Sequence, residues 1–430
     1  MLLNRIFHSQ IEVAGIYGGG SDGGAQIRIA RARTPYSGKI RRQRDDAVIY
    51  DTMKRHRPGS ARNFLLVFVL FVAAAGGATA VQQVPAAGTP AKELTDQQFW
   101  SLSKDSSEED GVFRSDNLLS NETSFQYVIP ELVRTVKQGR VYLGVGPEQN
   151  FTYISAVRPS MAIILHIRHG NLDVHLMYKA LFELSRDRAD FVSRLFSRKR
   201  PNGLTASSTA DEIFRAYLTA EGSKELYEEN LEAIESHLVK KHGFPLSSGD
   251  REGIRWAFGN FYRFGPAISY GSSLSTNVPP AIVGAVGGGG RGSGVTYADL
   301  MTSDDGRGQN RSYLASEDNF AFLKDLQNRN LVVPVVGDFG GDRAIRSVAR
   351  YLKSIDASVS AFYLSNVEQF LVQDGKWNTF CASASTLPLD ETSVFIRSGR
   401  GAARFGAGGV QNSSMATMLD DLQACAAGVR

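Results

Sequence analysis

Strongly apolar runs alternate with amphipathic segments along most of this chain, and no other feature restricts the fold as much. Residues 140–146 form an apolar run that ends in a glycine turn, and residues 161–167 form a second run. Between them, Pro147 suits the first position of a helix that continues from Glu148 to Ala156. Strands joined by helices and short turns in this way predict a parallel sheet with helices packed on it.

The same alternation returns near the end of the chain after a long interruption. Further strands are predicted at 331–336, 358–364 and 393–397, with helices at 317–329 and 342–354. Residues 200–315 instead contain helical segments and the glycine-rich loop 284–294, which we interpret as a helical insertion with a flexible flap. We therefore predict an α/β, Rossmann-like, mainly parallel sheet over residues 95–400, with the insertion at 200–315.

Local signals define several helix ends. Thr95 and Thr209 each open a capping-box pattern, so a helix is predicted after each of them. Residues 173–197 carry apolar side chains at helical spacing throughout and are predicted as one long helix. Asp342 is expected to cap the helix that follows it. The end of the chain, 401–430, is predicted as a loop that includes 406–413, followed by a helix from Met415 to Cys425.

A leader precedes the predicted domain. Basic residues between Lys54 and Arg62 come before the apolar run 64–75, and Ala78-Thr-Ala80 follows it. This order is typical of a secretory signal peptide at 53–80, since the apolar run is shorter than the ~20 residues of a membrane helix. We expect export; the alternative is a membrane anchor at 64–80, the only predicted membrane contact. The flanking segments are interpreted as a mis-assigned or disordered extension at 1–52 and a linker at 81–94.

The basic character of the chain is confined to its leader. The whole sequence carries 48 Lys and Arg against 44 Asp and Glu, a net charge of +4. Residues 1–62 hold 12 of the basic and five of the acidic residues, so the part from Val81 onward has 36 basic and 39 acidic residues and a net charge of −3. Bulk positive charge therefore gives no reason to expect a nucleic-acid partner for the domain.

Cysteine usage leaves two states open. Cys381 and Cys425 are the only cysteines in the chain. Outside the cytoplasm two cysteines can pair, whereas a reducing compartment keeps them as free thiols.

Residues 142–150, Tyr-Leu-Gly-Val-Gly-Pro-Glu-Gln-Asn, are the strongest candidate for a ligand site. A strand that ends in Gly-x-Gly before a helix lets the backbone approach a ligand, and the helix N-terminus favours an anion. The alternative is a turn whose glycines serve only close packing. The candidate cofactor-binding residues of this segment are Gly144, Gly146, Glu148, Gln149 and Asn150.

Polar residues also follow two other predicted strands. Because the carboxyl ends of parallel strands meet at one edge of the sheet, we expect these residues to share a cleft with the glycine turn. The alternative is that they cap turns and face water. The candidates are Asp338, Asn366, Glu368 and Gln369, with Asp116, Asn117, Asn121 and Glu122 as weaker members.

Histidines do not form a recognisable metal motif. His166 and His169 are close enough in sequence for both to reach one point, and His175 follows them. No cysteine lies near them and no His-Glu-x-x-His helix is present, so a metal site is not predicted.

The glycine turn resembles the first motif of S-adenosylmethionine-dependent methyltransferases, with three departures. Tyr142 stands where those enzymes have an acid, Pro147 and Glu148 replace the third glycine, and His166 or Arg168 replaces the acid that holds ribose hydroxyls. S-adenosylmethionine is therefore one possible cofactor. It is made in the cytoplasm, which conflicts with the expected export.

A longer resemblance spans roughly residues 95–400. The chain resembles an uncharacterised bacterial family of exported proteins and is similar to hypothetical proteins from acidobacteria and Leptospira. This resemblance implies a Rossmann-like, methyltransferase-like fold and brings no catalytic residue. The segments that carry it are Ser115–Glu122, Tyr142–Tyr153, His175–Glu183 and Phe362–Phe370.

Three functions follow from these observations. The first is an exported domain that binds or converts a small molecule at the glycine turn. The second is a methyltransferase that faces the cytoplasm, which requires a different interpretation of the leader. The third is a non-catalytic envelope interaction protein, in which the glycine turn is only packing.

Overall fold

The computed structural model describes residues 92–113, 115–273, 294–400 and 411–428. The predicted extension, the leader and most of the linker lie outside these residues, as does nearly all of the glycine-rich loop 284–294. Among the described residues, no helix combines the length and the hydropathy needed to cross a membrane.

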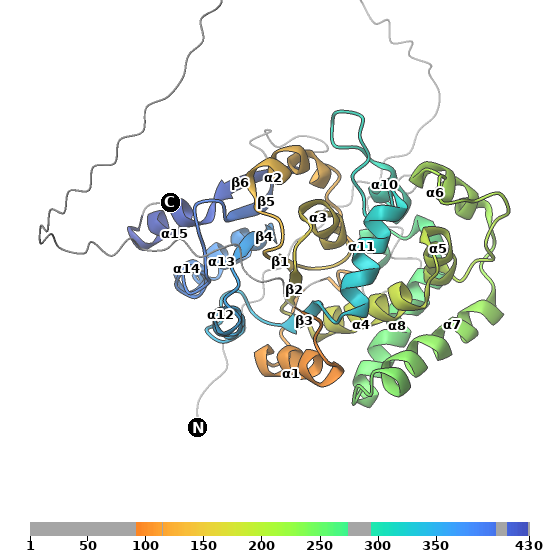
Figure 1. Ribbon diagram of the computed structural model, residues 1–430, viewed down its shortest axis with the longest axis horizontal. Helices are drawn as coiled ribbons and strands as arrows, with labels where there is room; N and C mark the ends of the chain where they lie inside the picture. The colour runs from red at the N-terminus through yellow and green to blue at the C-terminus, as the bar shows by residue number, and fades with distance from the viewer. Residues whose placement is uncertain (1–91, 114, 274–293, 401–410, 429–430) are drawn as a thin grey trace, which may run out of the picture. The chain divides into compact units, whose positions relative to one another are not determined.

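Six strands form a single sheet in the described part of the chain, in the order β3–β2–β1–β4–β5–β6 (Figure 1). Strands β1 to β5 are parallel and β6 is antiparallel to β5, which confirms a mixed α/β fold with a mainly parallel sheet. From β1 the chain moves outward to β2 and β3, and it then returns to β4 on the other side of β1. The strands are β1 (Val141–Val145), β2 (Met161–His166), β3 (Val332–Val336), β4 (Val359–Ser365), β5 (Val394–Arg400) and β6 (Gln411–Thr417).

Helices cover both faces of this sheet (Figure 1). All residues of β1, β2 and β3 are buried, which explains why these strands are continuous apolar runs in the sequence. One layer contains α2 (Ile129–Thr135), α3 (Gln149–Val157), α4 (His169–Leu184) and α11 (Glu317–Asn328). The other contains α12 (Ala344–Ser354), α14 (Trp377–Ala384) and α15 (Met418–Ala426), and the short α13 (Val367–Gln373) follows β4.

The predicted insertion is helical where the structure describes it. Its longest helix, α8, packs along α4 and so attaches the insertion to the α/β layers. Helices α5 and α7 also pack against α8, and α10 packs against α6. Helices α6 (Ala210–Thr219), α7 (Lys224–Ser236), α8 (Ser248–Phe264) and α10 (Tyr297–Thr302) form this part, with single turns at His237–Lys241, Gly265–Ala267 and Tyr270–Ser273. Helix α5 (Arg188–Phe196) precedes it in the chain.

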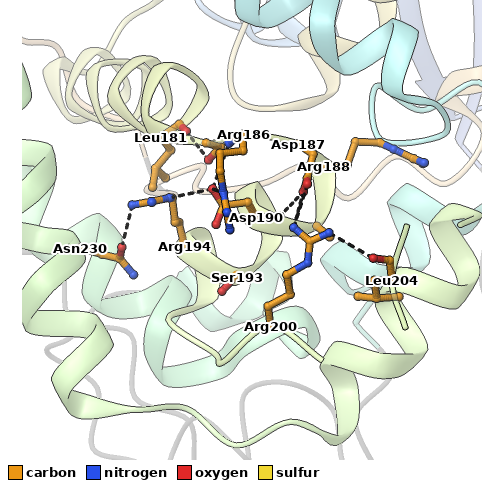
Figure 2. Close-up of polar contacts among 12 residues, drawn as sticks. Leu181, Arg186, Asp187, Arg188, Asp190, Ser193, Arg194, Arg200, Leu204 and Asn230 are labelled. Carbon is orange, nitrogen blue, oxygen red and sulfur yellow. Dashed lines mark hydrogen bonds and ion pairs between the residues drawn. The ribbon is translucent and has the colours of Figure 1, made fainter. Parts of the chain in front are cut away.

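The predicted single helix at 173–197 is wrong, because the structure divides it into α4 and α5. Asp187 begins α5: its carboxylate accepts a hydrogen bond from the Asp190 N–H at 2.8 Å, and Arg200 lies 2.8 Å from both carboxylate oxygens (Figure 2). Asp187 has an extended backbone, which cannot continue a helix but suits an N-cap. The apolar spacing continues across the break because both helices bury side chains in the same core.

Helix α1 (Asp96–Ser106) covers the outer edge of β3. Pro334 within β3 has no N–H, and its carbonyl oxygen accepts a hydrogen bond from the Ser103 hydroxyl at 2.6 Å. The Val336 N–H donates to Ser107 Oγ at 2.9 Å, and the Val336 carbonyl accepts from the Glu108 N–H at 2.9 Å. A segment more than 200 positions earlier in the sequence therefore provides hydrogen-bond partners for the backbone groups at the edge of this strand.

Glu108 also caps α12, which corrects the expectation for Asp342. The Glu108 carboxylate accepts hydrogen bonds from the N–H groups of Arg343 and Ala344, at 3.3 and 2.8 Å. Asp342 itself is exposed and makes no cap. The sequence could not show this, because the capping carboxylate comes from a distant segment.

Residues 411–417 form β6, where the sequence predicted a loop that leads into a helix. The segment reads Gln-Asn-Ser-Ser-Met-Ala-Thr, which has neither apolar alternation nor β-branched side chains before its last residue. Its strand conformation comes from the backbone ladder with β5, from Val394–Thr417 to Arg400–Gln411. Helix α15 consequently begins at Met418 rather than at Met415.

Cys381 on α14 and Cys425 on α15 form a disulfide, which decides between the two states that the sequence left open. The two residues are 44 positions apart in the chain. The bond joins the helices that precede β5 and follow β6.

Candidate functional site

A cavity of about 610 Å³ lies at the carboxyl ends of β1, β2, β3 and β4. The strand order reverses between β1 and β4, and ligands of open α/β sheets bind in the crevice beyond the strands at such a point. The walls combine aromatic rings with amide, hydroxyl and carboxyl groups, a composition typical of small-molecule sites. The candidate residues in these walls are Gly146, Gln149, Asp338 and Asn366, together with Asn117, Asn121 and Glu122 of the weaker set.

Asn150 holds the glycine turn from behind and does not line the cavity. Its buried Nδ2 lies 2.7–3.1 Å from the carbonyl oxygens of Val145, Gly146 and Pro147. Its Oδ1 accepts a hydrogen bond from the Tyr142 hydroxyl at 2.9 Å. Asn150 therefore fixes the turn instead of contacting a ligand.

The two glycines of the turn have different roles. A Cβ atom on Gly144 would lie 1.9 Å from Asn150 Oδ1, so this glycine makes room for the Asn150 side chain. Gly146 has a φ of +81°, which favours glycine, and a Cβ there would meet no atom within 4 Å. Gly144 is thus a packing residue, whereas Gly146 lies in the cavity wall.

Glu148 is fully buried behind the turn. Its Oε1 accepts a hydrogen bond from the Ser120 N–H at 3.2 Å, and its Oε2 has no hydrogen-bond partner among the described residues. Burial raises the pKa of Glu148 to about 8, so its carboxyl is mostly protonated at neutral pH. The side chain occupies the N-terminal end of α3, where the sequence suggested an anion site.

Gln149 lines the cavity and carries a buried acceptor, unpaired among the described residues. Its Nε2 donates to the Tyr363 hydroxyl at 2.6 Å, which fixes the amide. Its Oε1 is buried and has no hydrogen-bond partner in the described part of the chain. The residue is 3% exposed and is one of those that line the cavity.

His166, the last residue of β2, brings an imidazole to the cavity. Burial lowers its pKa to about 4, so the ring is neutral near pH 7. Its Nδ1 accepts a hydrogen bond from the Arg168 N–H at 3.0 Å, which leaves the ring proton on Nε2. Asn117 Nδ2 lies 2.9 Å from Nε2, and a half-turn of the amide group puts its oxygen there as the acceptor of this proton.

The ends of β3 and β4 add charged and polar groups. Asp338 forms an ion pair with Lys376 at 2.6 Å, and both line the cavity. Ser365, with a φ of +52°, donates a hydrogen bond to the Glu122 carboxylate. Burial raises the pKa of Glu122, partly opposed by the hydrogen bond from Ser365.

Glu368 and Gln369 do not belong to the cavity. Glu368 points to β5, where Arg397 Nε lies 2.8 Å from its Oε1. Gln369 is exposed on α13. Asp116 of the weaker set also lies outside the walls and pairs with Arg168.

Aromatic rings form the part of the cavity that sequence patterns did not indicate. Phe113 packs edge-on against Phe370 with ring centroids 5.3 Å apart, and Phe339 lines the wall at β3. Phe113 precedes the Ser115–Glu122 loop and Phe370 lies on α13. Only their nearness to polar candidates in the sequence pointed towards them.

The histidines separate into different environments. His175 Nε2 donates to the Gly146 carbonyl at 2.9 Å and supports the glycine turn, and burial lowers its pKa to about 4. His169 points away from His166, to Asp250 at 2.6 Å. The expectation that His166 and His169 reach one point is therefore wrong.

The fold and the cavity define a mixed α/β protein with a pocket at the carboxyl edge of its parallel sheet. The chain belongs to the family described as a domain of unknown function (DUF7790), whose model matches residues 118–243 and 295–423. The matched residues include all six strands and the cavity residues from Leu119 to Lys376 except Tyr270. No curated protein matches the chain.

Proposed function

We propose that this domain binds a small molecule in the cavity at the carboxyl ends of β1 and β4. The observation that carries the proposal is Gln149, which lines the cavity and whose buried Oε1 has no hydrogen-bond partner among the described residues. Leaving a buried acceptor unpaired costs roughly 1–3 kcal/mol, which a ligand donor recovers. The neutral His166 and the Asn117 amide supply further hydrogen-bonding groups at the same wall.

The walls favour a planar, polar ligand without net negative charge. Lys376 is the only lysine or arginine among the lining residues, and it is neutralised by Asp338. Glu122 and Asp374 add carboxyl groups, so a phosphate would meet repulsion. The edges and faces of Phe113 and Phe370 suit a heteroaromatic ring, which leads us to nucleosides and their uncharged or cationic derivatives.

The strand order supports a Rossmann-like relationship. The order β3–β2–β1–β4–β5 with a central reversal is that of doubly wound nucleotide-binding sheets. S-adenosylmethionine, a nucleoside with a sulfonium and no phosphate, fits the charge of the cavity. Methyl transfer is not part of the proposal, because Tyr142 is fully buried and bonded to Asn150 in the place of the acid of those enzymes.

Calorimetric titration of the full chain tests the proposal with adenosine, S-adenosylmethionine and S-adenosylhomocysteine as probes. We expect at least one probe to bind, with an affinity that Gln149→Ala and Asn366→Ala each lower at least tenfold. Gln369→Ala, on the exposed side of α13, is the matched control and keeps the affinity. Absence of binding for all three probes overturns the nucleoside class, and equal weakening in Gln369→Ala overturns the cavity as the site.

We also propose export of the domain. The order of basic, apolar and small residues at 53–80 supports it, and so does the disulfide between Cys381 and Cys425, since such bonds persist in oxidising compartments. N-terminal sequencing of the full chain after expression in a bacterial host is the test. A start at Val81 in the periplasm supports a cleaved signal. A protein in the membrane fraction that still contains residues 64–80 shows a membrane anchor in place of a cleaved signal peptide. An uncleaved chain in the cytoplasm overturns export.

A further inference from the structure

A second group of chemically active side chains lies outside the cavity, where α4 meets α8. His169 is the first residue of α4, Asp173 follows one turn later, and Asp250 lies in the first turn of α8. His169 Nε2 is 2.6 Å from Asp250 Oδ1 and 3.8 Å from Asp173 Oδ1. One donor atom from each of the three residues lies within 4.8 Å of the other two.

Asp173 has no lysine or arginine in salt-bridge contact in the described part of the chain, and its ion-pair partner is the His169 imidazole at 3.8 Å. Its side chain is 4% exposed, and its Oδ1 has no hydrogen-bond partner among the described residues. Gly253 on α8 adjoins this carboxylate, since a Cβ there would lie 2.0 Å from Asp173 Oδ2. A buried carboxylate in this state is costly unless a cation accompanies it.

We propose that His169, Asp173 and Asp250 bind a divalent transition-metal ion through Nε2 and one oxygen of each carboxylate. Metal–ligand bonds of about 2.1 Å place neighbouring donors roughly 3.4 Å apart in tetrahedral geometry. The separations of 2.6 and 3.8 Å from His169 lie on either side of this value, and all three donor atoms lie within 4.8 Å of one another. One imidazole and two carboxylates suit zinc and manganese.

The surroundings of the site agree with an accessible metal. A groove of about 710 Å³ is lined by Gly170, Gly249 and Gly253, each close in sequence to one of the three ligands. Three protein ligands leave a coordination position for water or a substrate oxygen. Asp110, whose carboxylate accepts the His169 N–H at 2.6 Å, also lines the groove and adds negative charge. Two cations oppose it: Lys104, and Arg168, which lines the groove and pairs with Asp116.

A second cluster of three possible ligands differs from the first in its charge balance. Glu183, His237 and His242 also bring three donor atoms within 4.8 Å. Here Lys179 and Lys241 lie 2.7 and 2.6 Å from the Glu183 carboxylate, so two ammonium groups already supply the positive charge. The first cluster has no lysine or arginine in salt-bridge contact with Asp173 or Asp250 among the described residues.

The test is metal binding by the full chain after dialysis against EDTA, with Zn²⁺, Mn²⁺ and Co²⁺ added separately. We expect about one equivalent of bound metal by elemental analysis and visible d–d absorption with Co²⁺. His169→Gln and Asp173→Asn each lower the affinity at least tenfold, whereas the control His237→Gln, in the second cluster, keeps it. Asp250 is left unchanged because it also caps α8 with Ser247.

Circular dichroism in EDTA distinguishes loss of metal from loss of fold in these variants. If Asp173→Asn does not fold, His169→Gln carries the test, because its imidazole is 30% exposed. Wild-type protein that binds no more metal than the double variant His169→Gln/Asp173→Asn overturns the proposal. Loss of binding in His237→Gln alone also overturns it and moves the metal to the second cluster.

Discussion

A single buried amide organises the glycine turn at the residue scale. Asn150 holds the carbonyl oxygens of Val145, Gly146 and Pro147 from the helix that follows them. His175 donates to the Gly146 carbonyl as well. The cavity wall at β1 is therefore held in place by side chains that do not line the cavity.

Gly144→Ala tests this packing. Its added Cβ would lie 1.9 Å from Asn150 Oδ1, so we expect the free energy of unfolding to fall by about 1–3 kcal/mol in urea titrations. Gly170→Ala, on α4, is the control, because its Cβ meets no atom within 4 Å, and we expect stability unchanged or higher by up to about 1 kcal/mol. Equal effects of the two substitutions would contradict the proposed role of Asn150.

Sequence patterns located the cavity better than they assigned the roles of the residues around it. The rule that ligands bind beyond the carboxyl ends of parallel strands brought Gly146, Gln149, Asp338 and Asn366 to one cavity. This rule could not show that the side chains of Glu148 and Asn150 pack behind the glycine turn and away from the cavity. Successive residues at the start of α3 point to different sides of the helix, and the rule does not say which side faces the cavity. The aromatic wall depends on contacts between distant segments, which carry no local signal.

At the scale of elements, the sequence predicted buried strands well and edges poorly. Strands β1 to β3 are continuous apolar runs because helices cover both faces. The polar β6 forms only because β5 offers it a ladder, and the break at Asp187 depends on Arg200 from beyond α5. Tertiary partners of this kind cannot be deduced from local periodicity.

The disulfide between Cys381 and Cys425 links the terminal helix α15 to α14. In the double variant Cys381→Ser/Cys425→Ser, we expect the free energy of unfolding to fall by about 2–4 kcal/mol, given a closed loop of 44 residues. Urea unfolding with and without reductant measures it. We expect reductant to lower the free energy of unfolding of the wild type towards that of the variant and to leave the variant unchanged. If reductant destabilises the variant as much as the wild type, the Cys381–Cys425 disulfide is not the source of the effect.

For the whole molecule, the buried titratable groups set the pH dependence of stability. The pKa of Glu148 rises from an ordinary value of 4.5 to about 8, so its contribution is complete below pH 4.5 and is lost as pH rises to about 8. His166 and His175, whose pKa values fall from 6.5 to about 4, act in the opposite direction and lower stability as pH falls between these values.

Glu148→Gln isolates the first of these effects. The amide keeps an acceptor for the Ser120 N–H but does not titrate. We expect the variant to gain stability relative to the wild type with rising pH, by up to about 1.4 kcal/mol per pH unit between pH 5 and 8. Urea unfolding at a series of pH values measures the difference, and parallel profiles of the two proteins would contradict the buried carboxyl.

The cover over the outer edge of β3 has a consequence for how copies of this chain meet. An exposed strand edge is a template on which another chain can add its own strand, the first step of aggregation. Here Pro334 lacks the N–H that such pairing requires, and Ser103, Ser107 and Glu108 already occupy the remaining backbone groups at that end. Crowded molecules can thus collide at this edge without joining their sheets.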